Sequence, residues 1–127
     1  MTFLLDTHTF IWLTGNDPKL PATLRETIDT AETVYLSIAS LWEIAIKVQL
    51  GKLALHQEYD LIGAELVASD IELLHIEFLD TAQVRKLETH HRDPFDRMLI
   101  AQAINRSLII LSNDRAFDAY EVERLWA

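Results

Sequence analysis

Four acidic residues, far apart in the chain, stand where their carboxylates could converge on a metal ion. Asp6 ends the apolar run 3–5, and Asp114 follows the apolar run 108–111 after two polar residues. Glu43 and Asp96 lie among apolar neighbours, where an ionised carboxylate needs a partner. Carboxylates about 4 Å apart repel by roughly 4 kcal/mol at an effective dielectric near 20. A converging set therefore raises its pKa values or binds a divalent cation.

Such a cation would be Mg²⁺, with Mn²⁺ as the other candidate, because hard oxygen ligands suit these ions. Bound by carboxylates, Mg²⁺ usually keeps open water positions. It would lower the pKa of a bound water, orient that water and stabilise charge on a scissile phosphate. The four acids therefore predict hydrolysis of a phosphodiester bond.

Each acid also has a purely structural interpretation. An Asp that follows a strand is often a turn or N-cap residue. Ser40 and Glu43 have the spacing of a capping box, in which Glu43 would fold back on the helix start. Asp93 is a natural N-cap with Pro94 at the first helical position, which leaves Asp96 near the positive end of the helix dipole. Spacing alone leaves both interpretations open.

The elements that must position these acids alternate between strands and helices. The strands are expected at residues 3–5, 34–36, 71–76, 108–111 and 120–126. The helices are expected at 8–13, 21–30, 41–50, 59–68, 80–88 with Asp80 as its cap, and 94–105. This alternation predicts a three-layer α/β/α fold with a mostly parallel sheet. Ligands of such sheets bind beyond the carboxyl ends of the strands.

Composition narrows the class of protein. With 127 residues, 50% hydrophobic and 24% charged, residues 1–127 are expected to form a single folded domain. The chain has no cysteine, which excludes a disulfide scaffold and a thiolate zinc site and fits a cytoplasmic location. We expect no signal peptide and no membrane partner. A net charge of −9 rules out nucleic-acid binding by bulk electrostatics, so such binding would need local basic groups or a metal.

Four segments together resemble the PIN-domain family, and within it the VapC-type toxins of bacterial toxin–antitoxin pairs. They are residues 4–8, 37–47, 93–103 and 112–117, and the resemblance spans essentially the whole chain in order. It implies a PIN-like fold and a metal-dependent endoribonuclease. It also implies a homodimer, an RNA substrate and a cognate antitoxin protein that neutralises the enzyme.

The resemblance also assigns roles to residues. The four acids of the family fall on Asp6, Glu43, Asp96 and Asp114, with Asp6 and Asp96 as direct metal ligands. The hydroxyl residue before the fourth acid falls on Ser112, where many relatives have Thr. Asp93 is an accessory residue that could instead be only a cap. Basic residues near these motifs could contact phosphate, and the set is Lys47, Arg97 and Arg115, with Lys52 and Arg92 as weaker candidates.

The remaining polar and aromatic candidates are expected to be structural. His90 and His91 lack spaced partner ligands and should face solvent, and His8 should be structural. The three tryptophans should lie in the core or an interface. The stretch 10–24 is expected to be an exposed apolar helix for contacts with a partner. The alternative to a nuclease is an Mg²⁺-binding interaction or signalling domain with an acidic pocket; a haloacid-dehalogenase-type phosphatase would need an Asp where His8 stands.

Overall fold

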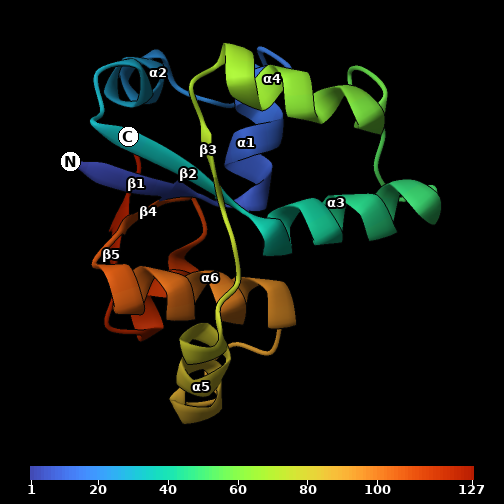
Figure 1. Ribbon diagram of the computed structural model, residues 1–127. Coiled ribbons are helices and arrows are strands. Elements are labelled where there is room, and N and C mark those ends of the chain that lie inside the picture. The colour runs from blue at the N-terminus through green and yellow to red at the C-terminus, as the bar shows by residue number, and fades with distance from the viewer.

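The computed structural model describes residues 1–127 and has a central sheet of parallel strands (Figure 1). The strands are β1 (Thr2–Leu5), β2 (Thr33–Ser37), β3 (Glu72–Leu74), β4 (Ile109–Leu111) and β5 (Glu123–Leu125). Their order across the sheet is β3-β2-β1-β4-β5, and all four neighbouring pairs are parallel. The expected parallel sheet is confirmed, and no strand in it runs antiparallel.

Helices cover both faces of this sheet. They are α1 (Thr7–Thr14), α2 (Ala22–Asp29), α3 (Ile38–Gln49), α4 (Ile62–Ala68), α5 (Phe78–Lys86) and α6 (Pro94–Arg106), with 3-10 turns η1 (Tyr59–Leu61) and η2 (Arg115–Ala119). Figure 1 shows α1, α2 and α4 on one side of the sheet and α6 on the other, with α5 packed against α6. The three-layer α/β/α fold is therefore confirmed. None of these helices is both long and apolar enough to cross a membrane.

The central strand β1 divides its side chains between two cores. Phe3 and Leu5 pack with α1, α2, α3 and α4, whereas Leu4 packs with α6. This follows from the alternation of side chains along a strand. Because helices cover both faces, every position of the apolar run is buried, as expected for a parallel sheet.

The strand order places a crevice at the carboxyl ends of β1 and β4. The chain leaves β1 toward β2 on one side, and β4 lies on the other side, so the connections diverge at this point. Asp6 follows β1 directly, and its backbone N–H donates to the Leu111 carbonyl at the end of β4, at 3.2 Å. Open α/β sheets bind their ligands at such a switch point.

Two local predictions were wrong. Asp80 is not the cap of its helix, because α5 begins at Phe78 with Glu77 as N-cap, and Asp80 is the third helical residue in a capping box. The stretch 10–24 is not one exposed helix. It is broken between α1 and α2, and Phe10, Leu20 and Leu24 belong to the buried core. Local hydrophobicity did not reveal that both helices bury these side chains against the sheet.

Candidate metal centre

A polar cavity of about 500 Å³ opens at the switch point. No hydrophobic residue lines it, and its walls come from the ends of β1 and β4, from α3 and from the start of α6. The lining residues are Asp6, Thr7, His8, Glu43, Lys47, His91, Asp93, Asp96, Asn113 and Asp114. The fold therefore brings all four acids singled out in the sequence, and Asp93, to one cavity.

Asp6 both begins a helix and faces the cavity. Its Oδ1 accepts a hydrogen bond from the Thr9 backbone N–H at 2.8 Å, so Asp6 is the N-cap of α1. Its Oδ2 has no hydrogen-bond partner, although every buried side-chain polar atom of the protein has one. The free oxygen must therefore be open to the cavity.

Glu43 is not part of a capping box. Helix α3 begins at Ile38, one turn earlier than expected, because the Ser37 hydroxyl caps it by accepting from the Ala39 N–H at 3.0 Å. Ser40 therefore lies inside the helix, and Glu43 projects from the second turn with almost no exposed surface. The structure removes the interpretation that Glu43 is needed to cap its own helix.

Both carboxylate oxygens of Glu43 have partners. Oε1 lies 2.7 Å from the Thr7 hydroxyl, and Oε2 lies 2.7 Å from the Lys47 ammonium. Thr7 also lies 3.0 Å from the Ser40 hydroxyl. A carboxylate only accepts, so Thr7 donates to Glu43 and accepts from Ser40. This chain fixes the Glu43 side chain at the cavity wall.

Asp93 and Asp96 share the start of α6. Asp93 Oδ1 accepts from the N–H groups of Phe95 and Asp96, at 2.8 and 3.1 Å, so the capping interpretation of Asp93 is confirmed. Asp96 Oδ2 lies 2.8 Å from His91 Nε2. The pKa of Asp96 is raised to about 6, mainly because the carboxyl is largely buried and also because of the charge of Asp93, while the contact with His91 opposes the shift.

Asp114 reaches the cavity from a turn after β4. Its Oδ1 accepts from the Ala116 N–H at 2.9 Å and caps the short turn η2. Ser112 is fully buried, and its hydroxyl accepts from the Asp114 N–H at 2.9 Å. Ser112 therefore shapes the turn that carries Asp114.

His91 was expected to face solvent, and that prediction was wrong. Its side chain is 20% exposed, and its ring contacts Asp96. One ligand atom from each of His91, Asp96 and Asp114 lies within 4.8 Å of the others. The sequence gave no signal beyond the position of His91 two residues before a helix cap, because the contact depends on how the preceding loop folds.

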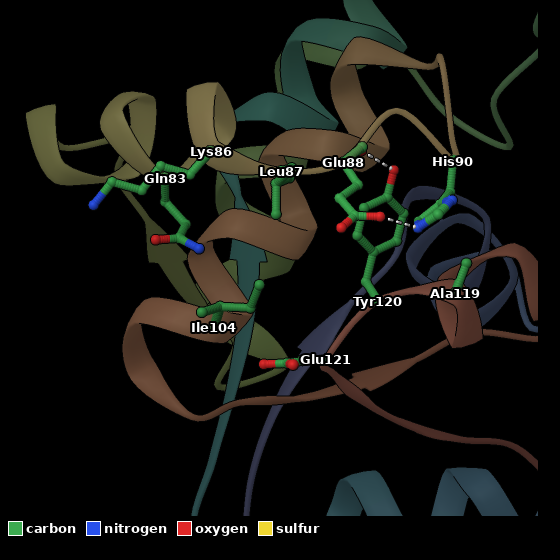
Figure 2. A pocket seen from close by; sticks show the side chains of 9 residues that line it. All are labelled: Gln83, Lys86, Leu87, Glu88, His90, Ile104, Ala119, Tyr120 and Glu121. Atoms are coloured by element: carbon green, nitrogen blue, oxygen red, sulfur yellow. Dashed lines mark hydrogen bonds and ion pairs between the residues drawn. The ribbon is translucent and has the colours of Figure 1, made fainter.

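Tyr120 holds the loop that carries His91. The Tyr120 hydroxyl accepts from the His91 backbone N–H at 2.8 Å and donates to the Glu88 carbonyl at 2.8 Å. Figure 2 shows Tyr120 directed at Glu88, whose carboxylate pairs with His90 at 2.9 Å. Tyr120 therefore supports a cavity residue from outside the cavity, and sequence reasoning missed it.

The donor set fits a hard divalent ion. Asp6, Asp93, Asp96 and Asp114 each give one oxygen to the protein and keep the other without a hydrogen-bond partner. Carboxylate oxygens with one imidazole suit Mg²⁺ or Mn²⁺. On geometry, Asp96, Asp114 and His91 form the closest set, and Asp6 lies on the same cavity.

A model of the PIN domain matches residues 3–123. This chain belongs to the PIN-domain family. The match covers nearly the whole chain, including β1, α3, α6 and the turn after β4, which carry the acids.

Solved structures share the fold of this PIN domain at low sequence identity. A chain of VapBC2 from Rickettsia felis, bound to a promoter DNA fragment, superposes with a TM-score of 0.75 at 16% identity and 98% coverage of both chains. DNA-bound VapBC from Salmonella typhimurium gives 0.72 at 19% identity, covering 98% of this chain and 97% of the other. FitAcB from Neisseria gonorrhoeae gives 0.63 at 20% identity, covering 98% and 96%. A search of curated protein sequences finds no significant match.

The basic residues of this PIN domain are divided between the cavity and the scaffold. Lys47 lines the cavity, and its hydrogen bond to Glu43 raises its pKa. Arg97 does not line the cavity. Its guanidinium donates to the carbonyls of Glu88, His91 and Val84 at 2.9 to 3.2 Å, which makes it a brace for the loop before α6. Arg115 is exposed on η2 and makes no ion pair.

Gln102 fixes the two acid-bearing helices relative to each other. Its side chain is fully buried in α6, and its Oε1 accepts from the Ser37 hydroxyl at 2.6 Å. Ser37 is the cap of α3, so this contact sets the start of α3 against α6 and thereby Glu43 against Asp96. A buried Gln in an apolar helix was the only sequence signal for this role.

Proposed function

We propose that this PIN domain is a metal-dependent endoribonuclease and the toxin of a toxin–antitoxin pair. The observation that carries the proposal is one cavity that gathers five carboxylates. Such crowding costs free energy unless a cation offsets it. Ordinary structural acids are paired, whereas four of these keep an oxygen open to the cavity.

Asp6 and Asp96 would hold the ion, with Asp114 and His91 beside Asp96. A bound Mg²⁺ or Mn²⁺ supplies a water of lowered pKa and stabilises negative charge on a phosphate. Glu43, held by Thr7 and Lys47, sets the wall of the cavity opposite α6. The Lys47 ammonium, which pairs with Glu43, gives the cavity a cation for a phosphate oxygen.

RNA is the proposed substrate, and phosphate contacts must be local because the chain carries a net charge of −9. Lys47 lies in the cavity, and Arg115 follows Asp114 directly with its side chain exposed. These are the proposed phosphate contacts. Their small number predicts weak RNA binding, and their ionic nature predicts that salt weakens it further. The bracing bonds of Arg97 argue against a direct role for it in binding.

The toxin role is supported by the shared fold with VapBC and FitAcB chains. A cognate antitoxin would block the acidic cavity, and we propose a homodimer as the active form. Large apolar side chains stay exposed at Phe78 and Leu79 in α5, and a protein interface could cover them. Light scattering of the purified chain tests the dimer, and a monomer at micromolar concentration would contradict it.

The decisive experiment is cleavage of end-labelled single-stranded RNA by antitoxin-free protein in Mg²⁺, Mn²⁺ or EDTA, with single-stranded DNA in parallel. We expect cutting of RNA in either metal, none in EDTA, and loss of at least about 100-fold in Asp6→Asn and Asp96→Asn. Asp60→Asn is the matched control, since Asp60 is exposed and lies outside the cavity.

Two outcomes would contradict the proposal. Cutting in EDTA, or full activity in both cavity variants, would remove the metal mechanism. Metal binding without cleavage of any RNA would instead favour the alternative of an Mg²⁺-binding interaction domain. Growth arrest on expression, relieved by Asp96→Asn but not by Asp60→Asn, tests the toxin role separately.

A further inference from the structure

A second cavity, of about 390 Å³, has the opposite character from the acidic one. It is a mostly apolar groove between α3 and the start of α6. We call it the aromatic groove, and Trp42, Phe95, Met98, Ile76 and Arg92 are among its lining residues. No residue of the proposed chemistry lines it.

The aromatic groove is built from the sequence neighbours of the acids. Trp42 precedes Glu43, Arg92 precedes Asp93, and Phe95 precedes Asp96, with the first of each pair in the groove and the second in the acidic cavity. The two cavities therefore share walls at α3 and at the start of α6. A polymer that runs past the acidic cavity on this side would meet the groove at these shared walls.

Trp42 is the exception among the three tryptophans. Trp12 and Trp126 pack against each other, with ring centroids 6.1 Å apart. Trp42 is 62% exposed, and its ring packs with that of Phe95 in a T-shaped pair, with centroids 5.4 Å apart and an interplanar angle of 83°. Leaving so much indole surface in water is unfavourable, so this ring has area to offer a ligand.

Arg92 supplies a free positive charge in the same groove. Its side chain is exposed and makes no ion pair or hydrogen bond, whereas Arg97, the other arginine of the groove, is held by three backbone carbonyls. Arg92 differs from Arg115, which is also exposed and without an ion pair, because it lies in the aromatic groove. It complements an anion seated next to an aromatic surface.

We propose that the aromatic groove binds a nucleobase of single-stranded RNA, stacked on Trp42, while Arg92 contacts the phosphate of that nucleotide. This inference rests on the proposed function, and it names the unpaired strand as the form of RNA that the site accepts. Aromatic side chains bind splayed bases of single strands in this way, and an arginine beside them binds the backbone. An apolar peptide would use the ring but not the free cation, which is why we favour RNA.

The test measures binding of a fluorescein-labelled, mixed-sequence, 12-nucleotide single-stranded RNA in Ca²⁺, with a gel to verify that the RNA stays intact. We expect Trp42→Ala to weaken binding by roughly 5- to 150-fold, the range of one base stack, and Trp42→Phe to retain most of it. Arg92→Gln should lower the slope of log affinity against log salt by about one. Leu50→Ala is the matched control, because Leu50 lies just beyond α3 and is 60% exposed.

Abasic nucleotides placed at each position of the RNA sharpen the test. In the wild-type protein, removal of one particular base should weaken binding as much as Trp42→Ala does. In Trp42→Ala, removal of the same base should have no further effect, because the partner ring is already gone. Equal effects of every abasic position in both proteins would overturn the inference.

The outcomes separate this inference from the proposed function. If EDTA and Asp96→Asn abolish cleavage while Trp42→Ala binds RNA like the wild type, only the groove inference fails. If Trp42→Ala loses dimerisation or antitoxin binding but keeps RNA affinity, the groove is a protein interface and the inference is overturned. If the wild-type protein binds no RNA, both fail. Unfolding temperatures within a few degrees of the wild type confirm that the variants fold.

Discussion

Two aspartates, Asp80 in α5 and Asp96 in the first turn of α6, have pKa values shifted in opposite directions. Asp80 has no exposed surface, yet its pKa lies below the ordinary value of 3.8. Burial alone would raise it, but hydrogen bonds from Arg106, the Glu77 backbone and Asn105 outweigh that effect. Asp96 is 21% exposed, yet its pKa is raised to about 6. Burial pushes both pKa values up, and the two acids differ because the partners of Asp80 outweigh burial whereas the contact of Asp96 with His91 does not.

The difference separates a structural acid from a candidate site. Asp80 receives both guanidinium nitrogens of Arg106, at 2.7 and 2.9 Å, and so joins α5 to α6 with every oxygen satisfied. Asp96 stands near Asp93 and keeps one oxygen unbonded. The Asp80–Arg106 pair stabilises the fold. The carboxylates of Asp96 and Asp93 repel each other, and a bound cation would offset that repulsion. Unpaired, crowded carboxylates in a cavity are therefore the better guide to function.

The largest expected effect comes from breaking the satisfied pair. Arg106→Met should lower the free energy of unfolding by about 3 kcal/mol, because it leaves the Asp80 carboxylate buried without its main partner. Urea denaturation at pH 7 measures this. The double variant Asp80→Leu/Arg106→Met should recover much of the loss. A cost below about 1 kcal/mol for Arg106→Met would show that the pair contributes little.

Replacing Asp96, which lies near other carboxylates, should instead raise the free energy of unfolding. A carboxyl whose pKa is raised on folding lowers stability as pH rises from its unfolded pKa to its folded one, so in metal-free protein the cost of Asp96 grows from about pH 4 and is complete above about pH 6. Asp96→Asn should therefore raise the free energy of unfolding by about 2 kcal/mol at pH 7.5 in EDTA. Millimolar Mg²⁺ should stabilise the wild type but not the variant. If Asp96→Asn were less stable than the wild type in EDTA, the Asp96 carboxylate would not be destabilising the metal-free fold.

The raised pKa also predicts how metal binding depends on pH. A ligand must lose its proton to bind, so apparent Mn²⁺ affinity should be nearly constant above about pH 7 and fall about tenfold per unit below the pKa of Asp96, about 6. Isothermal titration calorimetry with Mn²⁺ between pH 5 and 8 measures this affinity. Asp80 has a lowered pKa, so its contribution to stability should persist until pH falls below about 4. Metal affinity independent of pH over this range would exclude Asp96 as a ligand.

The smallest expected effect concerns Tyr120, which lies outside the acidic cavity and holds the backbone of His91. Tyr120→Phe keeps the ring but removes the hydroxyl that accepts from the His91 N–H, so it should cost about 1 kcal/mol of stability. It should also weaken Mn²⁺ binding several-fold by loosening His91. His90→Ala is the control, since His90 contacts the Tyr120 ring but does not line the acidic cavity. If both variants bind Mn²⁺ equally, Tyr120 does not position His91.

Much of the fold was accessible from the sequence because it is encoded locally. The apolar run of β4 predicted a strand covered on both faces, and the structure buries it on both. Asp93 and Pro94 predicted the start of α6 because a cap and a first-turn proline act within a few residues. The convergence of Asp6 and Asp114 was predictable as well, since parallel strands end at one edge of a sheet.

The sequence by itself determined which elements form and which acids could meet. Only the tertiary structure decided what each side chain does when the elements pack. Ser37, which caps α3 and also donates to Gln102 of α6, fixes the two helices against each other and leaves Glu43 free of a capping role. The Tyr120 hydroxyl holds the loop in which His91 contacts Asp96, and Arg97 donates to a carbonyl of that loop instead of lining the cavity. These outcomes depend on contacts between residues distant in sequence, and local periodicity carries no information about such contacts.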